Sequence, residues 1–302
     1  MKLLASLLLG VAALAGFARA DCGSIPFKPW VDVFEPNQRA VIAFNGVREI
    51  LLLSTDLRAS EPTKVLEVIP FPSEPKVGKG NVEAFAKATE IINRKLFPRK
   101  YIAGEMKGFG GMGGMGGGAA ELPPAGHVAM HKRIGAHDIS VVKVLDSRRF
   151  IAWVEDYLTK QGVDNPKIPG PLRPVIAEYL RDNCEWFAFN VVELGTETVS
   201  KEAIQYKFKT RYLYYPLRIT RAEKGDTTVR LLLISPRLLR IPNLGRPKVS
   251  LVHRPVRINY HELYEIDGDM RQMLGKSNNL LRIWEIKGRL SGFKRDVMTT
   301  WY

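Results

Sequence analysis

An alternation of apolar and polar side chains over residues 204–220 limits the possible folds more than any other pattern in this chain. One face of the predicted strand would carry Ile204, Tyr206, Phe208, Thr210, Tyr212 and Tyr214. We predict further strands at 40–44, 49–54, 64–69, 127–133, 137–145, 186–194, 227–235 and 280–290. Because most neighbouring elements are strands, the sequence predicts an α+β fold with a mainly antiparallel sheet.

About three helices accompany these strands, at residues 81–96, 147–160 and 174–181. Asp146 is placed to cap the second helix, and Gly162 is placed to end it. Asn45 and Gly46 lie between two predicted strands, and this pair is typical of a tight hairpin turn.

The first twenty residues have the pattern of a cleavable export signal. A positive charge at Lys2 precedes an apolar run of about 15 residues, which is shorter than the roughly 20 needed to span a bilayer. Small residues before Asp21 predict cleavage between Ala20 and Asp21. We therefore expect a protein of the periplasm or the extracellular space, with no transmembrane segment after cleavage. An uncleaved anchor and a lipid on Cys22 are the alternatives.

The predicted mature chain, residues 21–302, has a suitable length for a single α+β domain. Eight glycines over residues 108–118 predict a flexible Gly/Met-rich loop, to which we assign residues 104–125. Cys22 and Cys184 are candidates for a disulfide in an oxidising compartment, and two separate thiols are the alternative.

The positive charge of the chain is concentrated in its last third. Residues 201–302 carry 21 Lys and Arg against 9 Asp and Glu, a net charge of +12, and residues 227–261 contain no acidic residue. Candidate residues for binding a polyanion are Lys207, Lys209, Arg211, Arg237, Arg240, Arg246, Lys248, Arg254 and Arg257. The alternative is a solvated surface that keeps the protein soluble.

A soft metal ion is a second candidate ligand. Met112 and Met115 lie in the glycine-rich stretch, and His131 and His137 lie on either side of a predicted turn. Thioether and imidazole groups suit copper, so these four residues form a candidate copper site. The alternative is a loop without metal, followed by surface histidines. No other cofactor is predicted.

The sequence contains no familiar catalytic motif. His261 and Glu262 begin like a zinc-protease helix, but Glu265 stands where that motif has its second histidine. The glycine-rich stretch lacks the Lys-Ser/Thr ending of a phosphate-binding loop. These absences favour a protein that is not an enzyme, although a hydrolase built from residues far apart in the sequence stays open.

Several short segments resemble an exported bacterial family catalogued as domain-of-unknown-function family 2330. They are CG at 22–23, FEPNQRAVI at 34–42, EVIPFP at 67–72, IGAHDISVVKV at 134–144 and WFAFNVVEL at 186–194. The resemblance implies export and a shared fold, and it implies no activity, cofactor or catalytic residue.

Taken together, these features favour an envelope protein with a binding or structural role and a basic C-terminal surface. Outside the cytoplasm the available anions are anionic lipid, lipopolysaccharide and acidic polysaccharide. Another envelope protein is an alternative partner, whereas nucleic acid is in the wrong compartment.

Overall fold

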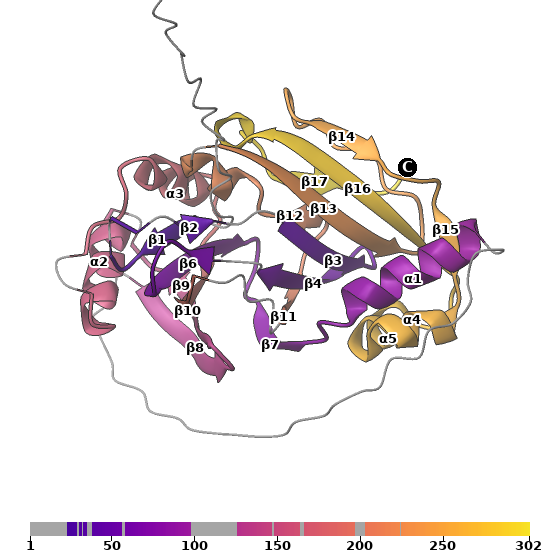
Figure 1. The fold of residues 1–302 in the computed structure, drawn as a ribbon, viewed down its shortest axis with the longest axis horizontal. Helices are drawn as coiled ribbons and strands as arrows, with labels where there is room; N and C mark the ends of the chain where they lie inside the picture. Colours follow the sequence, from indigo (N-terminus) through magenta and orange to yellow (C-terminus); the bar gives the residue numbers. More distant parts are fainter. Residues whose placement is uncertain are drawn as a thin grey trace, which may run out of the picture.

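The computed structural model describes residues 23–28, 30–31, 33–34, 38–55, 58–97, 126–146, 148–163, 166–196, 203–223 and 225–302. The predicted export signal, Cys22 and the predicted loop at 104–125 lie outside these residues. Two large β-sheets and five α-helices make up most of the described chain (Figure 1). No helix among the described residues is both long enough and apolar enough to cross a membrane.

The smaller of the two sheets has five strands, and every neighbouring pair is antiparallel. Its order is β1 (Ser24–Pro26), β6 (Thr63–Phe71), β10 (Trp186–Leu194), β9 (His137–Val144) and β8 (Gly126–Ile134). The turn between β8 and β9 contains Gly135 with a φ of 55°, a backbone conformation that suits glycine. This hairpin agrees with the two strands predicted around Gly135.

The larger sheet has eight strands. Its order is β14 (Lys248–Leu251), β16 (Asn279–Arg289), β13 (Asp226–Ser235), β3 (Gln38–Phe44), β4 (Arg48–Thr55), β11 (Ala203–Lys209) and β7 (Lys76–Gly80), and β15 (Val256–Ile258) also pairs with β16. All pairs are antiparallel except β13 with β3, which is parallel. The α+β fold with mainly antiparallel sheets is therefore confirmed.

Two further pairs of short strands lie outside the large sheets. They are β12 (Leu213–Tyr215) with β17 (Val297–Thr299), and β2 (Val33–Phe34) with β5 (Arg58–Ala59). Single turns of 3₁₀-helix occur at η1 (Arg218–Ala222) and η2 (Leu290–Gly292).

The described residues contain five α-helices, so the prediction of about three is wrong. The helices are α1 (Ala84–Leu96), α2 (Phe150–Lys160), α3 (Leu172–Arg181), α4 (Tyr260–Ile266) and α5 (Gly268–Leu274). The first three match the predicted helices. The last two have seven residues each, which is too short to show a helical period. The side chains of Asn259 and Glu262 cap α4 reciprocally, and this local signal was available in the sequence.

The elements stack in the order helix, sheet, sheet, helix. The helices α2 and α3 pack against one face of the five-stranded sheet. The largest apolar cluster draws on the other face of that sheet and on the facing side of the eight-stranded sheet. The helices α1, α4 and α5 cover the outer face of the eight-stranded sheet (Figure 1). Each sheet therefore buries both of its faces over much of its area.

The predicted strand at 204–220 is shorter than expected. Ile204, Tyr206 and Phe208 share the face of β11 that lies in the large core, as predicted. The strand ends at Lys209, because the Thr210 hydroxyl both donates to the carbonyl of Tyr212 and accepts from its N–H, which forms a turn. Lys207 and Lys209 therefore lie on β11, whereas Arg211 lies beyond its end.

Candidate functional site

Six cations that we predicted to bind a polyanion lie in the segment that follows β13 and forms the β14 and β15 edge of the eight-stranded sheet. They are all exposed and all belong to the segment between β13 and α4: Arg237, Arg240, Arg246, Lys248, Arg254 and Arg257. Among the described residues, no carboxylate lies within 4.0 Å of any of these six. We call the four that lie on or beside β14 and β15, from Arg246 to Arg257, the basic edge.

The basic edge places like charges opposite each other. Lys248 of β14 lies directly across from Lys287 of β16, an arrangement that costs stability when nothing compensates for it. Lys287 and Arg230 both contact Glu285, at 2.7 and 2.8 Å. Their hydrogen bonds hold the pKa of Glu285 below its usual value, with Lys287 contributing most. Glu285 therefore pairs with Lys287 and Arg230, and Lys248 has no carboxylate within 4.0 Å among the described residues.

Apolar side chains interrupt the cations of the basic edge. Leu251 is 40% exposed and Val252 is 53% exposed, and both lie between Lys248 and Arg254 in the sequence. A soluble protein commonly exposes single apolar residues, so neither residue is informative alone. Both follow Lys248 along the same edge of the sheet, although Leu251 lies opposite Trp284 and therefore on the other face of β14 from Lys248.

The other predicted cations lie near the opposite edge of the same sheet. Lys207 of β11 forms an ion pair with Asp269 of α5 at 2.7 Å, whereas Lys209 and Arg211 are exposed. Four strands lie between β11 and β14, so these two strands are about 24 Å apart at roughly 4.8 Å per strand spacing. The structure therefore does not bring the two predicted groups of cations together.

The two candidate metal-binding histidines lie on opposite faces of the five-stranded sheet. His131 lies across from Ser140, and its Nδ1 is 2.9 Å from the Ser140 hydroxyl. His137 lies three residues before Ser140, so its side chain leaves β9 on the other face. These two histidines cannot hold one ion together in this arrangement. Met112 and Met115 lie outside the described residues, and the described residues contain no cluster of three or more His, Cys, Asp or Glu side chains that could hold a metal.

His131 joins an acid and a hydroxyl, which is the connectivity of a hydrolytic triad. Its Nε2 lies 3.1 Å from Asp138, and its Nδ1 contacts Ser140. The Ser140 hydroxyl is also 3.1 Å from the Tyr157 hydroxyl of α2, and Ser140 is only 1% exposed. A nucleophile must reach its substrate, and here Tyr157 and the surrounding core cover the hydroxyl. We interpret this group as a polar link between the β8–β9 hairpin and α2.

A buried polar chain occupies the opposite face of β9. Asn190 of β10 contacts His137 Nδ1 at 3.0 Å and donates a hydrogen bond to Glu67 of β6. All three side chains are buried, and each comes from a different one of the segments that carry the family resemblance. Buried polar groups are costly unless they are hydrogen-bonded, so this chain fixes the register of β6, β10 and β9. Sequence reasoning missed it because the contacts depend on strand pairing.

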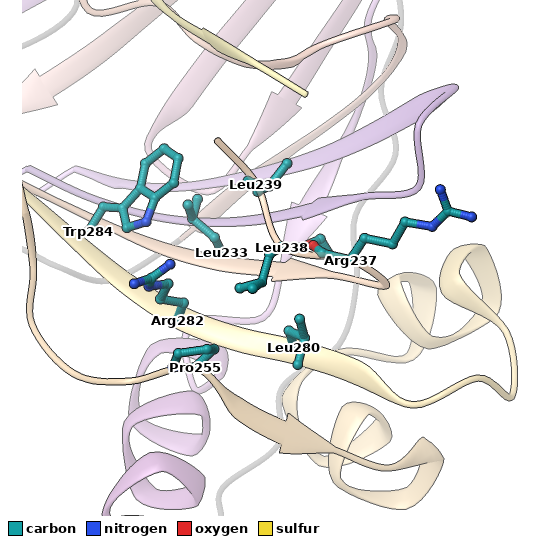
Figure 2. A pocket seen from close by; sticks show the side chains of 9 residues that line it. Leu233, Arg237, Leu238, Leu239, Pro255, Leu280, Arg282 and Trp284 are labelled. Carbon is teal, nitrogen blue, oxygen red and sulfur yellow. Dashed lines mark hydrogen bonds between the residues drawn. The ribbon is translucent and has the colours of Figure 1, made fainter. Parts of the chain in front are cut away.

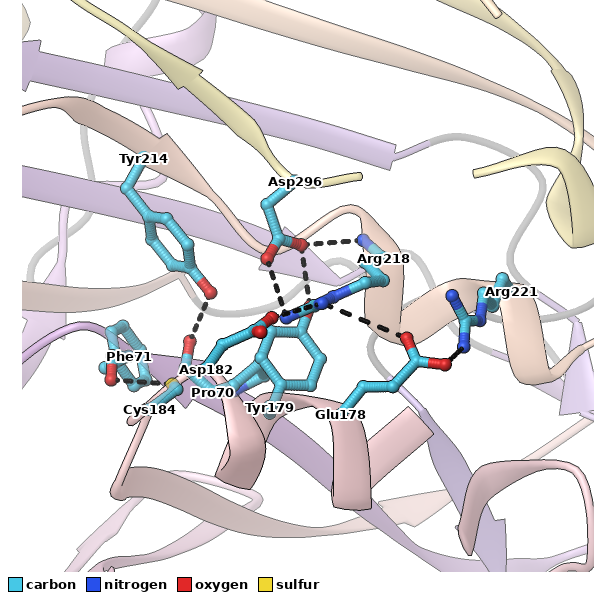
Figure 3. Close-up of polar contacts among 10 residues, drawn as sticks. All are labelled: Pro70, Phe71, Glu178, Tyr179, Asp182, Cys184, Tyr214, Arg218, Arg221 and Asp296. Carbon is cyan, nitrogen blue, oxygen red and sulfur yellow. Dashed lines mark hydrogen bonds and ion pairs between the residues drawn. The ribbon is translucent and has the colours of Figure 1, made fainter. Parts of the chain in front are cut away.

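A second buried network joins the C-terminal segment to α3 (Figure 3). Asp296 accepts hydrogen bonds from the Tyr179 hydroxyl at 2.6 Å and from the backbone N–H of Arg218 at 2.8 Å. The Arg218 guanidinium lies 4.0 Å from the centre of the Tyr179 ring and donates to Asp182 at 2.6 Å. Burial lowers the pKa of this guanidinium, but the contacts with Asp182 and Asp296 outweigh that effect and raise it. Arg218 is therefore a permanently charged group that holds η1 against α3 and Asp296.

Cys184 lies beside this network. Its thiol donates a hydrogen bond to the carbonyl of Phe71 at 3.0 Å (Figure 3). Burial, with a smaller contribution from Asp296, raises the pKa of the thiol to about 12. A thiol that stays protonated at neutral pH is a poor nucleophile. The predicted bridge to Cys22 stays a prediction, since Cys22 lies outside the described residues.

Comparison with known proteins gives a family and a weak structural likeness. The model of the family described as "Uncharacterized protein conserved in bacteria (DUF2330)" matches residues 17–245. No curated protein matches the sequence. A crystal structure of baculovirus P35 covers 93% of this chain and 99% of its own, with 11% identity and a TM-score of 0.44. A crystal structure of a mutated baculovirus P35 after caspase cleavage covers 88% of this chain and 99% of its own, with 10% identity and a TM-score of 0.40. Scores this low carry no argument about this chain.

Proposed function

This chain belongs to the DUF2330 family of uncharacterised proteins conserved in bacteria, and we propose that it is an exported, non-enzymatic protein that binds anionic lipid surfaces. The surface that would make this contact is the basic edge, Arg246 to Arg257. The proposal rests on one observation: the cations of this edge are exposed and lack carboxylate partners among the described residues.

Unpaired cations at one edge suit a charged surface better than they suit a small ligand. Near an anionic membrane each Lys or Arg contributes about 1 kcal/mol, and salt screens this attraction. The four cations of the basic edge would together contribute roughly 4 kcal/mol at low ionic strength. The other two exposed cations, Arg237 and Arg240, lie on the loop between β13 and β14 and would add to this attraction.

Exposed apolar side chains on the same edge favour lipid over an acidic polysaccharide. Leu251 and Val252 lie on the same edge of the sheet as the cations, and transfer of their exposed apolar surface into an apolar environment is favourable. A lipid surface offers anionic headgroups next to acyl chains, whereas a polysaccharide offers charge alone. The predicted leader supports an encounter with such lipids, because it directs the chain to the envelope.

The test is the retention of residues 21–302 on sedimented vesicles. Vesicles with about one-third anionic phospholipid would be compared with purely zwitterionic vesicles at low and high salt. The edge variant replaces the four cations of the basic edge: Arg246→Gln, Lys248→Gln, Arg254→Gln and Arg257→Gln. Its matched control, the far-edge variant, removes the same charge from the opposite edge: Lys76→Gln, Lys79→Gln, Lys209→Gln and Arg211→Gln.

We expect retention of the wild-type protein on anionic vesicles alone, and weaker retention at high salt. The edge variant should lose at least about tenfold in apparent affinity, and the far-edge variant should lose much less. Equal losses in the two variants would show that net charge matters and position does not, which contradicts the proposal. Retention on immobilised dextran sulfate together with no retention on vesicles would also contradict it.

A further inference from the structure

A narrow groove lies at the end of the large core, between β13, the loop that follows it, and β16 (Figure 2). Leu233, Leu238 and Leu280 form its apolar lining. Arg282 supplies its positive charge, whereas the side chain of Arg237 extends away from the other lining residues (Figure 2). The indole of Trp284 forms its inner end. Its enclosed volume is about 10 Å³, which is room for one water molecule or one oxygen atom of a larger group.

Two hydrogen-bond donors in this groove have no acceptor among the described residues. They are the Nε1 of Trp284 and the Nε of Arg282, and both atoms are buried. Trp284 is 0% exposed, and it lies two residues after Arg282 on the same face of β16. A buried donor without an acceptor destabilises the fold, so a group that accepts from both donors would be stabilising.

The arginines that line the groove have no ion-pair partner among the described residues. Among the described residues, no carboxylate lies within 4.0 Å of Arg282 or Arg237. Burial lowers the pKa of the Arg282 guanidinium, and the nearby Tyr302 raises it by a smaller amount. A partly buried cation with no partner has a high affinity for an oxyanion, because the oxyanion replaces the hydration that burial removed.

An apolar surface continues outward from the groove. Leu238 is 39% exposed at its rim, and Leu251 of β14 lies directly opposite Trp284 on the same face of the sheet. A ligand whose charged group reached the two donors would therefore lay an apolar chain over these side chains. Figure 2 shows the side chains of Leu238 and Leu280 together with that of Arg282 among the residues that line the groove.

We propose that this groove binds one anionic amphiphile, whose carboxylate or phosphate oxygen accepts from Arg282 and Trp284 while its acyl chain covers Leu238 and Leu251. The groove recognises a single molecule, so it goes beyond the attraction of the basic edge to a charged surface. It does not require that attraction, because a soluble amphiphile can reach it without a membrane.

The test is the titration of residues 21–302 with sodium decanoate below its micellar concentration, followed by calorimetry. Sodium acetate tests the charge without the chain, decanol tests the chain without the charge, and decyl phosphate tests the second oxyanion. The variant Arg282→Gln removes the cation, and Trp284→Phe removes the indole N–H while keeping a smaller aromatic side chain. Arg289→Gln is the matched control, because Arg289 is an exposed arginine on the same strand outside the groove.

We expect decanoate to bind at one site, and acetate and decanol to bind at least about tenfold more weakly. Arg282→Gln should weaken decanoate at least about tenfold, and Trp284→Phe should weaken it severalfold, while Arg289→Gln leaves it unchanged. Circular dichroism of each variant checks that it folds. If Trp284→Phe does not fold, the comparison of wild type with Arg282→Gln is the test.

Unchanged decanoate affinity in a folded Arg282→Gln variant would overturn this site. So would acetate binding as tightly as decanoate, since the chain would then contribute nothing. Neither result would bear on the basic edge, because the edge variant keeps Arg282 and Trp284 and is measured on vesicles.

Discussion

Two groups of cations in the last third of the chain differ in their neighbours. Arg218 and Lys207 contact carboxylates that come from distant segments, Asp296 and Asp269. The cations of the basic edge belong to an acid-free stretch, and the fold brings no described carboxylate to them. Positive charge in the sequence therefore corresponds to two different roles. Arg218 and Lys207 hold elements together, whereas the edge cations are free for a partner.

The largest expected effect on stability comes from breaking the buried member of the first group. Arg218→Gln leaves Asp296 buried without its cation, and breaking a buried pair costs about 3–5 kcal/mol. The matched control is Arg230→Gln, since Arg230 is an exposed arginine that pairs with Glu285. Its expected cost is about 0–1 kcal/mol. Urea unfolding of both variants measures the difference.

Equal destabilisation by the two substitutions would contradict the distinction between buried and exposed pairs. A smaller loss for Arg218→Gln than for Arg230→Gln would contradict it more strongly, because the buried network would then contribute nothing to the fold.

Glu49 differs from both groups, because it is a buried carboxyl group with no ion partner among the described residues. Its side chain accepts the backbone N–H of Tyr214 at 2.7 Å, and burial raises its pKa well above the usual value despite that hydrogen bond. The pKa of Glu49 is therefore higher in the folded state than in the unfolded state. Its contribution to stability is fully present below the unfolded-state pKa and is lost as the pH rises through the folded-state pKa.

Glu49→Gln removes this dependence. We expect the variant and the wild type to have similar Tm values near pH 4.5, and the variant to gain at higher pH. A gain of a few degrees by pH 8 corresponds to about 1 kcal/mol at this chain length. Calorimetric scans across this range measure it. A Tm difference that stays constant with pH would show that Glu49 does not titrate in the folded state.

The smallest expected effect belongs to the exposed pair of Lys207 with Asp269. Lys207→Gln should cost about 0–1 kcal/mol, because water and salt screen a half-exposed ion pair. Lys209→Gln has no pair to lose and should change stability by less than about 0.5 kcal/mol. A cost above about 2 kcal/mol for Lys207→Gln would place this lysine with Arg218 among the cations that hold the fold.

The sequence predicted the elements whose signals are local. The strand predicted at 186–194 coincides with β10, and the three predicted helices match α1, α2 and α3. The parallel pairing of β13 with β3 was beyond reach, because strand register depends on contacts between distant segments. The helices α4 and α5 were missed because two turns of helix show too little periodicity.

The candidate sites were only partly predictable for the same reason. The acid-free stretch contains the cations of the basic edge, and the fold brings no described carboxylate within 4.0 Å of them. The basic excess of residues 201–302 also grouped Lys207 with them, because nothing in the sequence shows that Asp269 of α5 pairs with this lysine of β11. The donors of Arg282 and Trp284 gave no signal, since an arginine and a tryptophan on a strand are ordinary residues until their partners are known.

Amide hydrogen exchange on vesicles measures whether the basic edge is the surface that contacts anionic lipid. Among the described strands none pairs with the outward N–H groups of β14 and β15, so these groups should exchange fast in the free protein. On anionic vesicles we predict slower exchange over residues 246–257 and unchanged exchange in β7 and β11. Slower exchange in β7 and β11, with no change at the basic edge, would contradict the account.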